Sequence, residues 1–200
     1  GFSAIQAGRA GEFASYGLPA HLKTLGFTLG RMKTGTPPRL KKNSIDFSAF
    51  TRQEPDPDPR PFSIFTESIT MPQMPSYLGK TSAEAHRIVS KNLSQSALYG
   101  GRISGISARY CPSLEDKIVK FGQRESHQII LEPEGVDTEE IYASGLGNSL
   151  PLETQVALVR SVRGLEQAEI MRPAYAIEYD FVDPLQLKPT LETKGVEGLY

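Results

Sequence analysis

Residues 26–42, GFTLGRMKTGTPPRLKK, join a strand pattern to a basic loop. Residues 26–35 read as a β-strand, and the residues after them read as a loop. No acid interrupts the positive charge between residues 30 and 42, which comes from Arg31, Lys33, Arg39, Lys41 and Lys42. A short basic stretch of this kind is typical of phosphate contact, but a solvated surface loop is an equal alternative.

The elements on either side of this stretch predict a mixed α/β fold. Helical spacing and end signals predict helices at residues 17–26, 81–93, 113–122 and 151–163. Capping boxes support two of them, Thr81 with Glu84 and Ser113 with Asp116. Strand patterns follow at 126–135, 168–182 and 195–200, and 51–61 read as a surface connection. Because helices and strands alternate irregularly, we expect a mixed sheet with helices packed on it.

Composition limits the class of protein. The chain has 200 residues, 38% of them hydrophobic, a formal net charge of −1 and a single cysteine. One cysteine excludes an internal disulfide framework and favours a reducing compartment. No apolar run approaches the roughly 18 residues of a membrane helix, and no histidines stand at metal-ligand spacing, so neither membrane nor metal is expected. The first residue is not methionine, which indicates a piece excised from a longer protein.

Cys111 lies in the stretch RYCPSLEDK at residues 109–117. A single free cysteine is more often an inert buried residue than a nucleophile. Here the cysteine precedes a predicted helix, whose N–H groups favour a thiolate, and Arg109 and Lys117 add positive charge nearby. The sequence therefore offers an activated thiol as the alternative to a buried one.

Asp116 lies five positions after Cys111, within reach of the same pocket mouth. A thiolate that adds to an electron-poor ring and a carboxylate that moves protons form a workable pair for activating a heterocycle. A plain helix cap explains Asp116 equally well, so both roles stay open. No GxGxxG fingerprint occurs in the chain, so a dinucleotide would receive only secondary contacts from it.

Successive segments of the chain resemble the GidA/MnmG family, among them KTGTPPR, RYCPSLEDK, HQIILEPEG, GLGNSLPLETQ and RPAYAIEYDF. This family comprises FAD-dependent tRNA uridine 5-carboxymethylaminomethyl modification enzymes of bacteria, with mitochondrial homologues. The resemblance implies the middle portion of a glutathione-reductase-like FAD-binding fold with an inserted mixed α/β domain. Residues 1–37 would belong to the flavin domain, 38–182 to the insert on the NAD and tRNA side, and 183–200 to the return strand.

The resemblance also implies a reaction at the wobble uridine of tRNA. Cys111 would be the nucleophile that adds to C6 of the uracil, and Asp116 a proton-transfer group. Methylenetetrahydrofolate would supply a one-carbon unit by way of FAD, NADH would reduce the flavin, and glycine or ammonium would supply the amine. A GTPase of the MnmE type would be the partner, in a homodimer located in the bacterial cytoplasm or in mitochondria.

Further site residues are implied by the same motifs. Ser107–Phe121 matches a segment assigned to NAD contact, which includes Ser107, Arg109, Tyr110 and Lys117. Ser15 matches a flavin-contacting serine, and Arg9, Lys33 and Arg39 would contact flavin phosphate or tRNA, with Lys41 and Lys42 on the tRNA side. Where the family usually has Gly-Pro before its RYCPS motif, this chain has Ser107 and Ala108.

Two alternative functions stay open. The paralogous folate- and FAD-dependent tRNA uracil-5-methyltransferase is the nearest enzyme, although the RYCPSLEDK and EPEG segments argue against it. A module of another class would dock RNA or serve as a scaffold without catalysis. We expect the isolated 200 residues to be inactive, because the main flavin fingerprint is absent from them.

Overall fold

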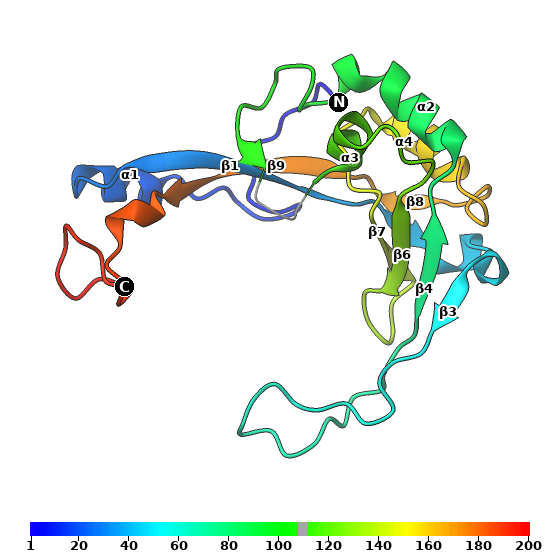
Figure 1. The fold of residues 1–200 in the computed structure, drawn as a ribbon, viewed down its shortest axis with the longest axis horizontal. Coiled ribbons are helices and arrows are strands. Elements are labelled where there is room, and N and C mark those ends of the chain that lie inside the picture. Colours follow the sequence, from blue (N-terminus) through cyan, green and yellow to red (C-terminus); the bar gives the residue numbers. More distant parts are fainter. Residues whose placement is uncertain (108–111) are drawn as a thin grey trace.

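Two β-sheets organise the chain in the computed structural model, which describes residues 1–107 and 112–200 (Figure 1). The smaller sheet has the strand order β5-β1-β9, with bounds Ile106–Ser107, Leu29–Thr36 and Tyr175–Val182. β1 and β9 pair antiparallel along their whole length, and β5 adds a short parallel partner to β1. They form a long ribbon that extends from the larger sheet to helix α1, Gly17–Thr24 (Figure 1).

The larger sheet is antiparallel, with the strand order β3-β4-β6-β7-β2-β8. Its strands in chain order are β2 Arg39–Lys41, β3 Thr51–Gln53, β4 Ser76–Lys80, β6 Gln128–Pro133, β7 Glu140–Ser144 and β8 Ile170–Arg172. Alternate residues of β6 and β7 are buried, namely Ile129 and Leu131, and Ile141 and Ala143. This alternation is expected for a sheet with one face on the core. The mixed α/β class predicted from the sequence is therefore confirmed.

Helices α2 (Ala83–Lys91), α3 (Leu114–Lys120) and α4 (Leu152–Arg160) gather beside the larger sheet (Figure 1). They place Val89, Leu114 and Leu158 in one core cluster with the inward residues of β6 and β7. Short 3-10 turns complete the fold at Lys42–Ser44, Phe47–Ala49, Leu93–Gln95 and Pro184–Gln186. In the described ranges 1–107 and 112–200, no helix is long and apolar enough to cross a bilayer.

Two of the places where the chain passes between the sheets lie next to each other. Pro37 and Pro38 separate β1 from β2, and because proline has no N–H group it cannot continue a ladder. The return is at Pro173 and Ala174, between β8 and β9. The domain boundaries inferred from the sequence stay a prediction. That prediction assigns β9 to the insert. However, β9 pairs with β1, which the same prediction assigns to the flavin domain.

Several local predictions need correction. The cap of α2 is Ser82, whose side chain accepts the N–H of Ala85, and not Thr81. The predicted strand at 195–200 is absent, because this stretch consists of turns and bends. On α4, predicted at 151–163, the apolar Leu152 is exposed, whereas the polar Thr154 and Gln155 face the interior. The cap of α3 at Ser113 is confirmed.

Residues 54–75 form an excursion that leaves β3 and returns at β4 (Figure 1). It contains no helix or strand and exposes Phe62, Ile64 and Phe65 almost completely. The predicted surface connection at 51–61 is confirmed except for its first residues, which form β3.

Candidate functional site

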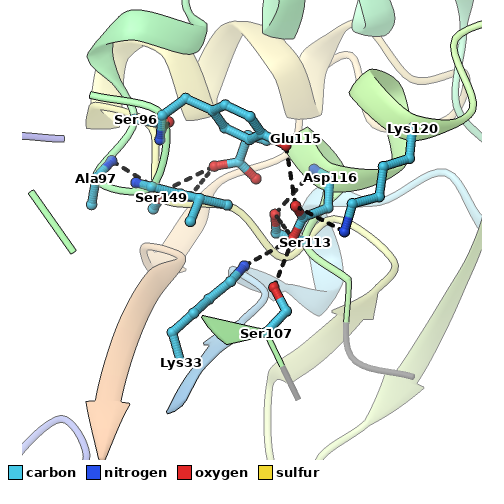
Figure 2. A network of polar contacts seen from close by, with 11 residues as sticks. Lys33, Ser96, Ala97, Ser107, Ser113, Glu115, Asp116, Lys120 and Ser149 are labelled. Atoms are coloured by element: carbon cyan, nitrogen blue, oxygen red, sulfur yellow. Dashed lines mark hydrogen bonds and ion pairs between the residues drawn. The ribbon is translucent and has the colours of Figure 1, made fainter. Parts of the chain in front are cut away.

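A buried carboxylate at the start of α3 joins this helix to the smaller sheet (Figure 2). Asp116 is 4% exposed, and its Oδ2 accepts from Lys33 Nζ at 2.9 Å. The hydroxyl groups of Ser107 and Ser113 donate to the same oxygen at 3.2 and 3.3 Å. Lys33 comes from β1 and Ser107 from β5, so residues far apart in the sequence meet at one atom.

The second oxygen of Asp116 is also occupied. Tyr99 donates its hydroxyl to Oδ1 at 3.1 Å, and Lys120 Nζ lies 3.7 Å from the same atom. Burial and the negative charge of Asp116 raise the pKa of Tyr99 to about 12. Tyr99 is therefore a hydrogen-bond donor at neutral pH and not a base.

The charge state of Asp116 follows from these contacts. Burial alone would raise the pKa of Asp116, but the hydrogen bond and charge of Lys33, with Lys120 and Tyr99, hold it below its usual value. A carboxylate that accepts several hydrogen bonds keeps its charge to low pH. Because an efficient proton-transfer group has a pKa near the working pH, Asp116 is poorly suited to that role.

The strand register brings Lys33 and Ser107 together. They are direct partners in the parallel pair of β1 and β5. Gly105, just before β5, lies so close to β1 that a Cβ atom would be 2.8 Å from the backbone of Met32. A glycine at this position therefore allows the close approach on which the Lys33–Ser107–Asp116 arrangement depends.

Glu115, next to Asp116, ties α3 to a second loop. Its side chain is fully buried, and Oε1 accepts from the N–H and hydroxyl of Ser149 at 2.8 and 3.0 Å (Figure 2). Ser149 in turn accepts the N–H of Ala97 at 3.1 Å. The two neighbouring acids thus face different partners, and both hold α3 in place.

Several residues predicted for the site lie at or beside this network. Cys111, Arg109 and Tyr110 fall outside the described residues. Ser107 is at one flank of that segment, and Lys117 is half-buried on α3. The roles of these residues in NAD contact and catalysis stay predictions.

Lys33 requires a correction. It was expected to contact tRNA or flavin phosphate, but it is 2% exposed and paired with Asp116. The structure does not present it to a phosphate backbone. The remaining cations lie nearer the surface: Arg39 pairs with Glu134, Lys41 pairs with Glu169 at 3.2 Å, and Lys42 is exposed.

The predicted flavin contacts lie in the N-terminal segment. Arg9 and Ser15 are exposed, and Arg9 pairs with Glu12 at 2.7 Å. A cavity of about 160 Å³ brings Arg9 and Arg39 together, with Tyr175 also in its lining. Residues 1–107 and 112–200 contain no group of three or more His, Cys, Asp or Glu side chains that could hold a metal ion.

Sequence reasoning missed part of the network. Lys120 follows Asp116 by four residues on a predicted helix, so the spacing of an ion pair was visible. Tyr99 gave no such signal, because it belongs to an irregular segment. Nor could the partner of Lys33 be seen, because that pair depends on the register of β1 with β5.

The fold and the network define a mixed α/β protein in which a buried ion pair joins helix α3 to the smaller sheet beside a cysteine-bearing segment. The model of the family described as "Glucose inhibited division protein A" matches residues 1–200. The chain belongs to this family.

Relatives and solved structures agree with this assignment. The tRNA uridine 5-carboxymethylaminomethyl modification enzyme MnmG of Syntrophobacter fumaroxidans is 62% identical over 200 residues, and that of Geobacter sulfurreducens is 53% identical. Aquifex aeolicus GidA in its form II crystal matches with a TM-score of 0.85 and 46% identity over 100% of this chain. The chain spans only 31% of the Syntrophobacter protein, 32% of the Geobacter protein and 32% of the Aquifex chain.

Proposed function

We propose that the chain is part of an FAD-dependent enzyme that installs a carboxymethylaminomethyl group on C5 of the wobble uridine of tRNA. The observation that carries this proposal is the 62% identity along all 200 residues to a relative named for that modification. Because the chain spans about a third of that relative, the activity is proposed for the whole protein and not for these residues alone.

In the proposed reaction, Cys111 acts as the nucleophile. Its thiolate forms a bond to C6 of the uracil, and the C5–C6 π electrons move toward C5, which then attacks a one-carbon electrophile that is bonded to the amine of glycine. Loss of the C5 proton and departure of the thiolate restore the ring. Nucleophilic catalysis of this kind divides one difficult substitution into easier steps.

Most of the residues that bind the cofactors would lie in parts of the whole protein outside these 200 residues. When bound, FAD would supply the redox chemistry that delivers the one-carbon unit of methylenetetrahydrofolate, with NADH as reductant. Arg9 and Ser15 are exposed and fit secondary contacts to the flavin. In α3, Leu114, Glu115, Asp116 and Ile118 are buried, so an NAD contact from the described part of Ser107–Phe121 would fall to the half-buried Ser107 and Lys117 or to exposed residues such as Pro112 and Lys120.

We also propose tRNA, an MnmE-type GTPase and a second copy of the protein as partners. For tRNA, the exposed Lys42 and the half-buried Lys41 support a phosphate contact at the 3-10 turn after β2. Lys33 is no longer part of this surface, for the reason given above.

Replacing Cys111 tests the proposed reaction. In the full-length protein, Cys111→Ser should abolish modification at position 34, measured by mass spectrometry of digested tRNA, while flavin absorbance is retained. Ser104→Ala is the matched control, because Ser104 is exposed in the segment leading to β5. Modified uridine at the wild-type level in Cys111→Ser would falsify the nucleophile assignment. A 5-methyluridine product from the wild-type protein would instead identify a methyltransferase.

A further inference from the structure

The residues on both sides of the segment that carries Cys111 donate hydrogen bonds to one carboxylate oxygen, Oδ2 of Asp116. Ser107 ends β5 immediately before residues 108–111, and Ser113 caps α3 shortly after them. Figure 2 shows both hydroxyl groups directed at Asp116, where each is within 3.3 Å of Oδ2. The same atom therefore restrains the place where the segment leaves β5 and the place where it enters α3.

Lys33 fixes this carboxylate to β1 of the smaller sheet. Its Nζ lies 2.9 Å from Oδ2, and the two side chains are 3% and 6% exposed. Attraction between opposite charges is stronger where water is excluded. Because Lys33 and Ser107 are also register partners, β1, β5 and α3 converge on one carboxylate.

The hydrogen bonds that Asp116 already accepts argue against a role for this carboxylate as a base. Lys33, Ser107 and Ser113 donate to Oδ2, and Tyr99 donates to Oδ1. Each donor stabilises the ionised form, so a proton taken from a substrate would have to displace an existing partner. Such an arrangement favours holding neighbouring groups in place over moving protons.

We propose that Asp116 is a positioning residue, which Lys33 holds in place and which restrains both flanks of the Cys111 segment. This inference rests on the proposed function, in which Cys111 is the nucleophile. It assigns to Asp116 an effect on the placement of the thiol and no part in the chemical step. Ser107 carries the restraint on the β5 side.

Ser107 provides the sharpest test, because its removal leaves the Lys33–Asp116 pair and the Ser113 cap intact. In the full-length protein, we expect Ser107→Ala to lower kcat about tenfold with KM for tRNA unchanged, since small misplacements of a reacting group have effects of this size. The pH midpoint of Cys111 alkylation by iodoacetamide, followed on its peptide by mass spectrometry, should also move. Ser107→Thr keeps the hydroxyl and should retain wild-type values, as should Ser104→Ala.

Three results would overturn the positioning role. The first is wild-type kcat and wild-type alkylation in Ser107→Ala. The second is a defect of Ser107→Ala confined to KM for NADH, which would make Ser107 a cofactor contact only. The third is an Asp116→Asn variant that loses turnover but keeps the wild-type alkylation profile, because the carboxylate would then act in the chemistry. If the wild-type protein modifies no tRNA, the proposed function fails, but the alkylation profiles still decide the positioning role.

Discussion

Lys33 and Asp116 form a buried ion pair. Replacing only one of the two residues is strongly destabilising, because it leaves the other charge buried without a partner. Removing two charges from water carries a large desolvation penalty, which their attraction and the surrounding hydrogen bonds offset. Lys33 was expected on a phosphate-binding surface because its neighbours in the sequence are basic. In the folded protein its side chain is directed inward to Asp116, so local charge density was a poor guide to exposure.

We expect Asp116→Asn to lower the free energy of unfolding by about 3–5 kcal/mol, because it leaves Lys33 buried without its carboxylate. The double variant Lys33→Met/Asp116→Asn buries no charge and should lose much less than the sum of the single variants Lys33→Met and Asp116→Asn. Urea denaturation of the full-length protein measures both. Additive losses in this double-mutant cycle would contradict a coupled pair.

The pH dependence of the same pair provides a control. The folded-state pKa of Asp116 is lowered, so its contribution to stability is complete above the unfolded-state value of about 3.9. That contribution is lost as the pH falls through the lower folded-state pKa. The stability advantage of the wild type over the double variant should shrink in that acid range.

The junction between α2 and β6 is held by threonine and histidine contacts. Thr81 Oγ1 accepts the N–H of His127 and lies 2.8 Å from Nε2 of His86. The two imidazole rings are 5.0 Å apart, and His127 is buried. Burial lowers the pKa of both rings, and for His127 the charges of His86, Lys117 and Arg124 lower it further. Both histidines are therefore neutral in the folded state at neutral pH.

We expect the protein to lose stability as the pH falls below about 6.5, the ordinary pKa of histidine, because the unfolded chain then binds protons that the folded chain does not. The loss ends at the lower folded-state pKa values. Thermal unfolding at pH about 7.5 and about 5.5 measures it, and His86→Gln/His127→Gln should show a smaller difference. An equal difference in the variant would place the pH dependence elsewhere.

Elements with strong local signals were predicted well. α3 begins at Leu114, directly after its cap Ser113, as its capping box indicates, and β6 follows its apolar alternation. The cap of α2 was misplaced by one residue, because Thr81 and Ser82 both suit the position and Thr81 is used by the histidines instead. The stretch 195–200 has an apolar pattern but no strand partner, so it forms no strand.

At the scale of the whole molecule, two sheets meet beside Pro37, Pro38 and Pro173. β1 and β9 project from the larger sheet as a ribbon, whereas α2, α3 and α4 pack beside the larger sheet (Figure 1). Lys41 and Lys42 lie just after the first crossing, at the end of β2. They are among the cations of the basic stretch that stay near the surface, as Arg31 also does.

We expect Lys41→Ala/Lys42→Ala in the full-length protein to weaken tRNA binding and to reduce the slope of log affinity against log salt by about 1–2, since each lost phosphate contact contributes about one unit. Filter binding over a salt series measures this slope. Lys23→Ala/Lys91→Ala removes the same charge from exposed positions on α1 and α2 and is the control. Equal slopes in the two variants would show that the basic stretch is only solvated surface.

The sequence by itself determined the mixed α/β class, the positions of the four α-helices and of β1, β6, β8 and β9, and the family resemblance, and it predicted a role for the stretch around Cys111. These depend on local patterns, such as periodicity, caps and motif order, which act over a few residues. Only the tertiary structure decided that Lys33 meets Asp116, that Ser107 lies beside both, and that Tyr99 completes the network. The physical reason is that strand register and helix packing bring together residues up to 83 positions apart, and no local pattern encodes such a pairing.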